Sequence, residues 1–215
     1  LHAAGDTDVV VRALDRAIGD ALRRLQASRC RRHRADDYKI AAACVGTAGL
    51  DQPGDAERHR RAFARCRFLH RIPLDVVSDV AIIADCGTAP VRVCLIAGTG
   101  SNCYAARFDR DGRPQNEVYV GGLDLTIADD GSAAWVAHEA FREAVYAITA
   151  PYRDTKIGIA LCRRFGIDPH DPTDWRRLKG VRERLTKRQL AALSEEILAP
   201  LVSRRDPVAR AIFHN

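Results

Sequence analysis

The stretch "VCLIAGTGSNCYAARF", residues 93–108, sets two apolar segments around a turn dense in glycine, hydroxyl and amide groups. The segments that flank this turn predict the two strands of a hairpin. A hairpin can turn with Asn-Gly alone, so the extra glycines and hydroxyls need another explanation. Backbone N–H groups and hydroxyls gathered in one turn are typical of a site that holds phosphate. The stretch therefore predicts a phosphate-binding turn between two strands.

Strand and helix patterns alternate on both sides of this hairpin. Apolar residues recur at helical spacing over 8–27, and "KIAAACVG" (39–46) and "IPLDVV" (72–77) have the composition of buried strands. Further helices are expected over 51–68, 132–148, 153–165, 187–199 and 206–214. This order predicts an α/β domain over residues 1–128, followed by the start of a second, more helical domain over 129–215.

Composition and charge restrict the class of protein. Of 215 residues, 47% are hydrophobic and 29% are charged, as in folded soluble domains. No apolar run reaches the roughly 20 residues that a membrane helix needs. The net charge is +6, and "RCRRHR" (29–34) is either a nucleic-acid or membrane patch or the solvated end of a helix. Because no aromatic residues interleave with these arginines, we expect neither a nucleic-acid nor a membrane partner.

The seven cysteines favour a cytoplasmic protein with reduced thiols. Their number is odd, and they form no C-x-x-C pair and no cluster with histidine at zinc spacing. We therefore expect no metal bound by cysteine. The sequence also starts at Leu1 and contains no methionine, which indicates an internal piece of a longer product.

Carboxylates accompany the predicted turn on both sides. Asp79 follows the strand 72–77, at the strand end where open α/β sheets bind ligands. It could act as a base toward an attacking hydroxyl or simply cap the next helix. Downstream, "GGLDLTIADDGS" (121–132) carries Asp124, Asp129 and Asp130. These side chains could bind sugar hydroxyls or a metal, or stabilise a helix N-terminus through its dipole.

The order and spacing of four motifs resemble those of a known family. "TAGLDQPGD" (47–55), "SD" (78–79), "LIAGTGSN" (95–102) and "GG" followed by "DDGSAAWVAHEA" (129–140) are similar to the N-acetylglucosamine kinase group. This group belongs to the BadF/BadG branch of the actin-like, sugar kinase and Hsp70 ATPase superfamily. The resemblance implies an actin-like, ribonuclease H-like α/β fold and an enzyme that phosphorylates the 6-hydroxyl of N-acetylglucosamine, or of a related amino sugar, with ATP and Mg²⁺.

The resemblance also implies roles for individual residues. Asp79 matches the catalytic base, and Gly98, Thr99 and Gly100 match the turn that holds the ATP phosphates. The positions expected to contact the sugar are Thr47, Ser101, Asn102, Gly122 and Asp129. Sugar and ATP would be the partners, and a homodimer is one option for the assembly.

The sequence departs from the family in several places. The first phosphate loop has no counterpart, because Asp85-Cys86-Gly87-Thr88 lies only 13 residues before Gly98 and falls in the helix after the base. Leu123, Asp124 and Ala128 replace a tryptophan and two glycines of the sugar loop, and Asp130 replaces a glutamate. The family's adenosine loop would lie beyond residue 215, so we expect the 215-residue chain by itself to be inactive as a kinase.

Three hypotheses remain open at the level of the sequence. The first is an N-acetylglucosamine kinase. The second, which the altered sugar loop motivates, is a degenerate relative that binds sugar or phosphate without turnover. The third is an ATPase activator of acyl-CoA dehydratases and reductases. Such activators hold an iron–sulfur cluster between subunits, and no cysteine here stands in a matching glycine-rich context.

Overall fold

The computed structural model describes residues 4–28, 39–50, 52–150, 154–171 and 173–214. The basic stretch at 29–34 lies outside these residues. The chain divides into two compact units, Leu1–Pro90 and Val91–Asn215. This division falls before the hairpin rather than near residue 128, because the hairpin's turn is bonded to the helix that starts at Ala133. The domain boundary expected near residue 128 stays a prediction.

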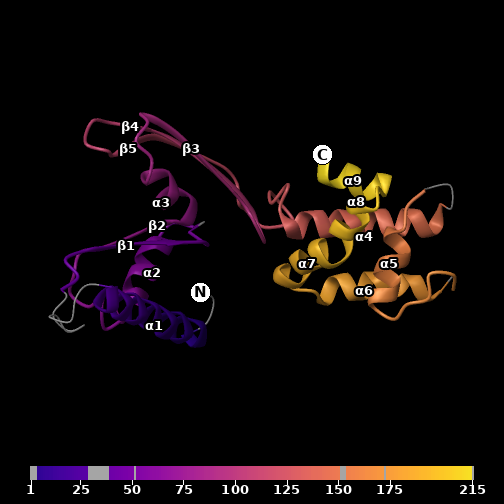
Figure 1. Cartoon of the computed structure of the whole chain (residues 1–215), viewed down its shortest axis with the longest axis horizontal. Coiled ribbons are helices and arrows are strands. Elements are labelled where there is room, and N and C mark those ends of the chain that lie inside the picture. The colour runs from indigo at the N-terminus through magenta and orange to yellow at the C-terminus, as the bar shows by residue number, and fades with distance from the viewer. Residues whose placement is uncertain (1–3, 29–38, 51, 151–153, 172, 215) are drawn as a thin grey trace. The chain divides into compact units, whose positions relative to one another are not determined.

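The first unit surrounds a short parallel strand pair with helices (Figure 1). Its elements are α1 (Ala4–Ser28), β1 (Ala43–Thr47), α2 (Asp55–Phe63), β2 (Leu74–Ser78) and α3 (Asp79–Asp85). The register runs from Ala43 opposite Leu74 to Thr47 opposite Ser78. A buried cluster of Val11, Phe63, Cys66, Leu69 and Leu74 holds α1 and the segment after α2 against the strands. The strands and helices expected here are therefore present.

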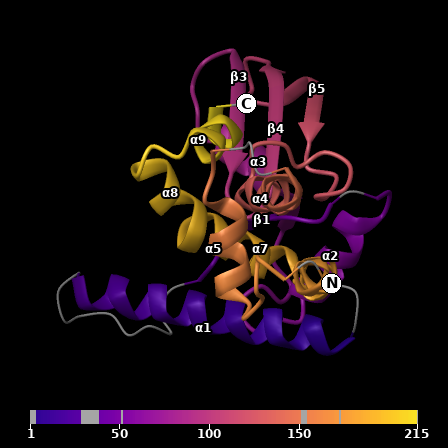
Figure 2. The same ribbon diagram turned by 90° about the vertical axis from the view of Figure 1, so that its right-hand side faces the viewer.

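The second unit opens with an antiparallel sheet of order β3-β4-β5, whose strands lie side by side in Figure 2. They are β3 (Val91–Ala97), β4 (Ser101–Phe108) and β5 (Pro114–Gly121). The first two are the predicted hairpin, with Ala97 opposite Ser101. The third strand was not predicted, although Val118 and Val120 alternate with other residues along it. Its pairing sets Gly121 opposite Asn102, which brings the glycine-rich loop beside the turn.

Helices make up the rest of this unit. They are α4 (Ala133–Thr149), α5 (Ile157–Arg164), the short helix η2 (Asp174–Arg176), α6 (Arg177–Arg184), α7 (Lys187–Leu193), the π-helical turn η3 (Ser194–Leu198), α8 (Ala199–Ser203) and α9 (Pro207–His214). Ser132 caps α4 by accepting the N–H of Trp135 at 3.1 Å. The helix expected over 187–199 is thus α7 continued by a π-helical turn, and α6 was not predicted. Among the described residues, no helix is both long and apolar enough to cross a membrane.

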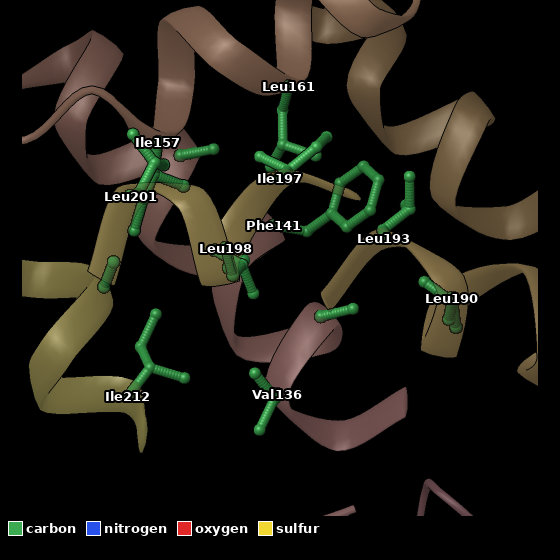
Figure 3. Close-up of a cluster of buried hydrophobic side chains, with 14 of the residues drawn as sticks. Val136, Phe141, Ile157, Leu161, Leu190, Leu193, Ile197, Leu198, Leu201 and Ile212 are labelled. Carbon is green, nitrogen blue, oxygen red and sulfur yellow. The ribbon is translucent and has the colours of Figure 1, made fainter. Parts of the chain in front are cut away.

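The core of the second unit lies among these helices. Figure 3 shows part of it, including Phe141 of α4, Leu161 of α5 and Leu190 of α7. Leu161 and Leu190 are each 1% exposed. Burying a leucine side chain fully contributes about 1.5–3 kcal/mol, so this cluster stabilises the helical layer on which the hairpin's turn is fixed.

Leu161→Ala should lower the free energy of unfolding by about 3 kcal/mol, because a fully packed leucine leaves a cavity when it is truncated. Urea denaturation followed by circular dichroism measures the loss. Leu161→Met is the matched control, since it keeps the volume and should cost less than about 1.5 kcal/mol. Equal losses for the two variants would show that volume at this position is not what matters.

Candidate functional site

The turn Gly98–Gly100 joins β3 to β4 and is bonded to the start of α4. Within the turn, the N–H of Gly98 donates to the carbonyl of Gly100 at 2.8 Å. The carbonyls of Gly98 and Thr99 accept the N–H groups of Ala133 and Ala134, at 2.9 and 3.4 Å. These are the first two residues of α4, whose N–H groups have no partner inside the helix. The turn thus occupies the helix N-terminus that an anion would otherwise use.

The turn keeps donors of its own. Among the residues that the structure describes, the N–H groups of Thr99 and Gly100 have no acceptor, and the Thr99 hydroxyl has no partner. Two successive N–H groups without acceptors beside a hydroxyl form the kind of donor set that binds phosphate oxygens. The predicted phosphate turn therefore has donors available for an anion.

Asp129 and Lys187 form a buried ion pair beside the turn. Asp129 is 2% exposed, and its Oδ1 accepts the N–H of Ser101 at 3.1 Å. Its Oδ2 pairs with the Lys187 ammonium, which also lies 3.5 Å from Oδ1 of Asp124. The Ser101 hydroxyl donates to the carbonyl of Asp130 at 2.8 Å. The Asp129 carboxylate thus holds β4 and α7 to the acidic loop.

Lys187 was not found from the sequence. It is the first residue of α7, where Thr186 and Gln189 form a reciprocal capping box. That box marks the start of a helix in the sequence. Nothing local indicates that the side chain at this start reaches a carboxylate 58 residues earlier in the chain.

Three residues at the end of β5 and in the loop after it have backbone conformations that favour glycine. Gly121, Gly122 and Asp124 all have positive φ, of 81°, 76° and 79°. Asp124 stands where the family resemblance leads us to expect glycine, and aspartate is among the residues that tolerate this conformation best. A hydrogen bond from the Leu125 N–H, together with the Lys187 charge, holds the pKa of Asp124 below its usual value. The positive φ at position 124 thus explains why glycine would be favoured there.

Asn102 and Gly122 are packed tightly against each other. A Cβ on Gly122 would lie 2.8 Å from Cγ of Asn102, so any larger residue would collide with the amide. Oδ1 of Asn102 is buried and has no hydrogen-bond partner among the described residues. A buried acceptor without a donor costs about 1–3 kcal/mol, which a ligand hydroxyl would recover by donating to it. A ligand hydroxyl would reach this oxygen only after the Asn102 side chain turned away from Gly122.

Thr47 and Asp79 belong to the first unit, where they lie at one edge of its strand pair. Thr47 ends β1 opposite Ser78, and Asp79 follows directly as the first residue of α3. Ser78 caps this helix by accepting the N–H of Ala81 at 3.2 Å. Within the parts of the chain that the structure describes, Asp79 accepts a single hydrogen bond, from the N–H of Val80 at 2.9 Å through Oδ1. The helix cap is thus supplied by Ser78, which leaves Oδ2 of Asp79 for another role.

The first unit also places the sequence that mimics a phosphate loop. Asp85 is the last residue of α3, and Cys86 ends the helix. This agrees with the expectation that the Asp-Cys-Gly-Thr stretch belongs to the helix and turn after the predicted base.

No metal cluster stands out near these residues. Among the described residues, no three His, Cys, Asp or Glu side chains gather as metal ligands would. Oδ1 of Asp129 accepts the N–H of Ser101, and Oδ2 is in an ion pair with Lys187, although among the described residues it accepts no hydrogen bond of regular geometry. This carboxylate therefore does not fit a magnesium ligand, and we assign no chemical step to a metal here.

Gly100→Ala should disturb the buried pair. A Cβ there would lie 2.8 Å from Nζ of Lys187 and 3.1 Å from Oδ1 of Asp129, so the ammonium must leave its position. We expect a loss of about 1–3 kcal/mol in unfolding free energy, measured by thermal unfolding. Gly98→Ala is the matched control, because a Cβ at Gly98 meets no atom within 4 Å. An equal effect of both variants would contradict the packing described here.

Comparison with solved structures identifies the fold. A candidate N-acetylglucosamine kinase from Chromobacterium violaceum matches with a TM-score of 0.53 and 23% identity, over 80% of this chain and 54% of that protein. A second candidate N-acetylglucosamine kinase, from Porphyromonas gingivalis, matches with a TM-score of 0.55 and 22% identity, over 81% of this chain and 56% of that protein. The chain has the fold of these kinases. It spans a little over half of their length.

This kinase-like fold confirms the resemblance inferred from the sequence motifs, at the level of the fold. A mixed α/β architecture is also confirmed, whereas membership of the actin-like ATPase superfamily and the start of a second domain stay predictions. No protein-family model matches the sequence, and no curated protein matches it as a relative. The fold assignment therefore depends on three-dimensional similarity.

Proposed function

We propose that the protein phosphorylates the 6-hydroxyl of N-acetylglucosamine or a related amino sugar with ATP, in the cytoplasm. One observation carries this proposal: the fold of two candidate kinases is combined with a glycine-rich turn whose N–H groups at Thr99 and Gly100 have no acceptor among the described residues. Neither feature alone specifies a sugar kinase. Together they favour a phosphate-binding kinase over an unrelated α/β protein.

The proposed chemistry is mainly positioning. The turn would hold ATP phosphates through the Thr99 and Gly100 N–H groups and the Thr99 hydroxyl. Asp79 would accept the proton of the attacking hydroxyl as the oxygen–phosphorus bond forms and the bond to ADP breaks. The buried Oδ1 of Asn102 would accept a hydrogen bond from a sugar hydroxyl. Ser101 and Asp129 would act beside it through the geometry they give to β4.

Calorimetric titration of the 215-residue chain with N-acetylglucosamine, with glucose as the control sugar, is the first test. Saturable binding of N-acetylglucosamine and weaker binding of glucose are expected. Transfer of labelled phosphate from ATP to the sugar is then measured on a longer form of the protein that includes the flanking sequence, because the 215-residue chain spans only a little over half of the kinases it matches. Binding without transfer would replace the kinase by a non-catalytic sugar-binding relative. Absence of binding to either sugar, in a folded sample, would refute the proposal.

A further inference from the structure

A cavity of about 450 Å³ lies in the second unit, apart from the turn and its acidic loop. One wall is a single face of α4, because His138, Phe141, Arg142 and Val145 follow at helical spacing. The facing wall comes from η2 and the first two turns of α6. Its volume is within the range of small-molecule sites, which is about 300–1,000 Å³.

The interior of this cavity is apolar and aromatic. Phe141 and Val145 of α4 face Trp175 and Leu178 from the other wall. Phe141 is 6% exposed and Leu178 is 1% exposed, so both are also part of the packed core. Trp175, which also lines the cavity, is half-buried. Aromatic side chains of this kind are suited to hold a flat apolar ligand.

The rim of the cavity is cationic. It carries Arg142, Arg176, Lys179 and Arg182. Glu139 pairs with Arg142 at 2.8 Å, and Glu183 lies 3.5 Å from Lys179 in an exposed pair. Within the described part of the chain, Arg176 and Arg182 form no ion pair. Arg182 donates to His138 through Nε, and the Arg176 guanidinium lies 5.8 Å from the centre of the Trp175 ring, so the terminal N–H groups of both are left for an anion at the mouth of the cavity.

His138 lies in the wall of the cavity, beside Arg182. Its Nδ1 accepts a hydrogen bond from Nε of Arg182 at 3.1 Å, so this nitrogen carries no proton. Burial lowers the pKa of His138, as do the charges of Arg182 and Arg142, while Glu139 opposes them. Burial and the two neighbouring guanidinium groups therefore both disfavour a proton on this imidazole.

We propose that this cavity is a binding site for a small amphipathic anion, with a flat aromatic body between α4 and α6 and a carboxylate at Arg176 and Arg182. The apolar interior would take the ring, and the two guanidinium groups would bind the carboxylate by charge-assisted hydrogen bonds. The site is separate from the turn. It begins at His138, about 8 Å along α4 from Ala133, and extends to Val145, about 18 Å along. Its lining residues include none of those proposed to bind ATP or the sugar.

Calorimetric titration of the 215-residue chain with 2-naphthoate tests the site, and 2-naphthylmethanol is the neutral control. We expect saturable binding of the anion. The alcohol should bind at least about tenfold more weakly. Arg176→Gln with Arg182→Gln should weaken naphthoate binding by about tenfold or more. Arg188→Gln with Arg210→Gln removes the same charge from exposed positions of α7 and α9, and should leave it unchanged.

A second variant tests the cavity rather than the charge. Val145→Trp places a large ring in the space between the helices, and should abolish naphthoate binding while the thermal unfolding transition is retained. The proposal is overturned if naphthoate does not bind saturably, if the alcohol binds equally well, or if the two pairs of arginine variants lose affinity equally. Because sugar binding is measured separately, failure here leaves the kinase proposal intact.

Discussion

Asp79→Asn is expected to lower the rate of phosphoryl transfer by about 100- to 10,000-fold, the usual contribution of a general base. The amide keeps the shape of the carboxylate and can still accept the N–H of Val80, so α3 should form as before. It cannot take the proton of the attacking hydroxyl. A coupled assay for ADP measures the rate, and calorimetry should find sugar binding largely unchanged.

The matched control for this variant is Asp85→Asn, at the other end of the same helix. Asp85 is exposed and ends α3, whereas Asp79 begins it. The control should retain the wild-type rate. If Asp79→Asn also retained it, Asp79 would have no role as a base and would act only in the structure of the helix start.

Lys187→Met is expected to lower the free energy of unfolding by about 2–3 kcal/mol. The variant leaves the Asp129 carboxylate, whose side chain is 1% exposed, without its cation. Removing one partner of a buried pair costs up to about 3–5 kcal/mol, and the 37% exposure of the Lys187 side chain reduces the expected value. Thermal unfolding should show a melting temperature lower by several degrees, with Ser101 and the turn less protected from hydrogen exchange.

Two variants distinguish the loss of the Asp129–Lys187 ion pair from the loss of a positive charge as such. Lys179→Met breaks an exposed pair whose side chains are 83% and 62% exposed, and should cost less than about 0.5 kcal/mol. Adding Asp129→Asn to Lys187→Met removes the stranded charge and should recover part of the stability. If Lys187→Met and Lys179→Met cost the same, the pair with Asp129 does not stabilise the fold.

The elements of the hairpin could be predicted because their signals are local. The apolar segments around Gly98–Gly100, and the turn residues between them, needed no distant partner to indicate two strands. The same holds for Ser132, whose cap begins α4 where the helical pattern begins. The strand β5 was missed because its residues are mostly exposed and its pairing with β4 settles its structure.

The least predictable part of the site is its assembly from distant segments. Asp129 could be proposed as a ligand residue from the family resemblance, but its pairing with Lys187 depends on how α7 packs near the loop. The backbone conformation that favours glycine at this position of the sugar loop could not be predicted from the sequence either. Only the backbone of Asp124, with φ of 79°, shows the conformation that this position requires.

The start of α4 donates two hydrogen bonds to the carbonyls of Gly98 and Thr99. These bonds couple any movement of the turn to the helix. A helix of 17 residues is about 25 Å long and resists bending between its ends. If anion binding shifts the turn, either these hydrogen bonds break or α4 shifts with the turn as a rigid body. If the helix moves as a whole, Phe141 and Val145 move with it. These two residues of α4 belong to the wall of the cavity that faces α6.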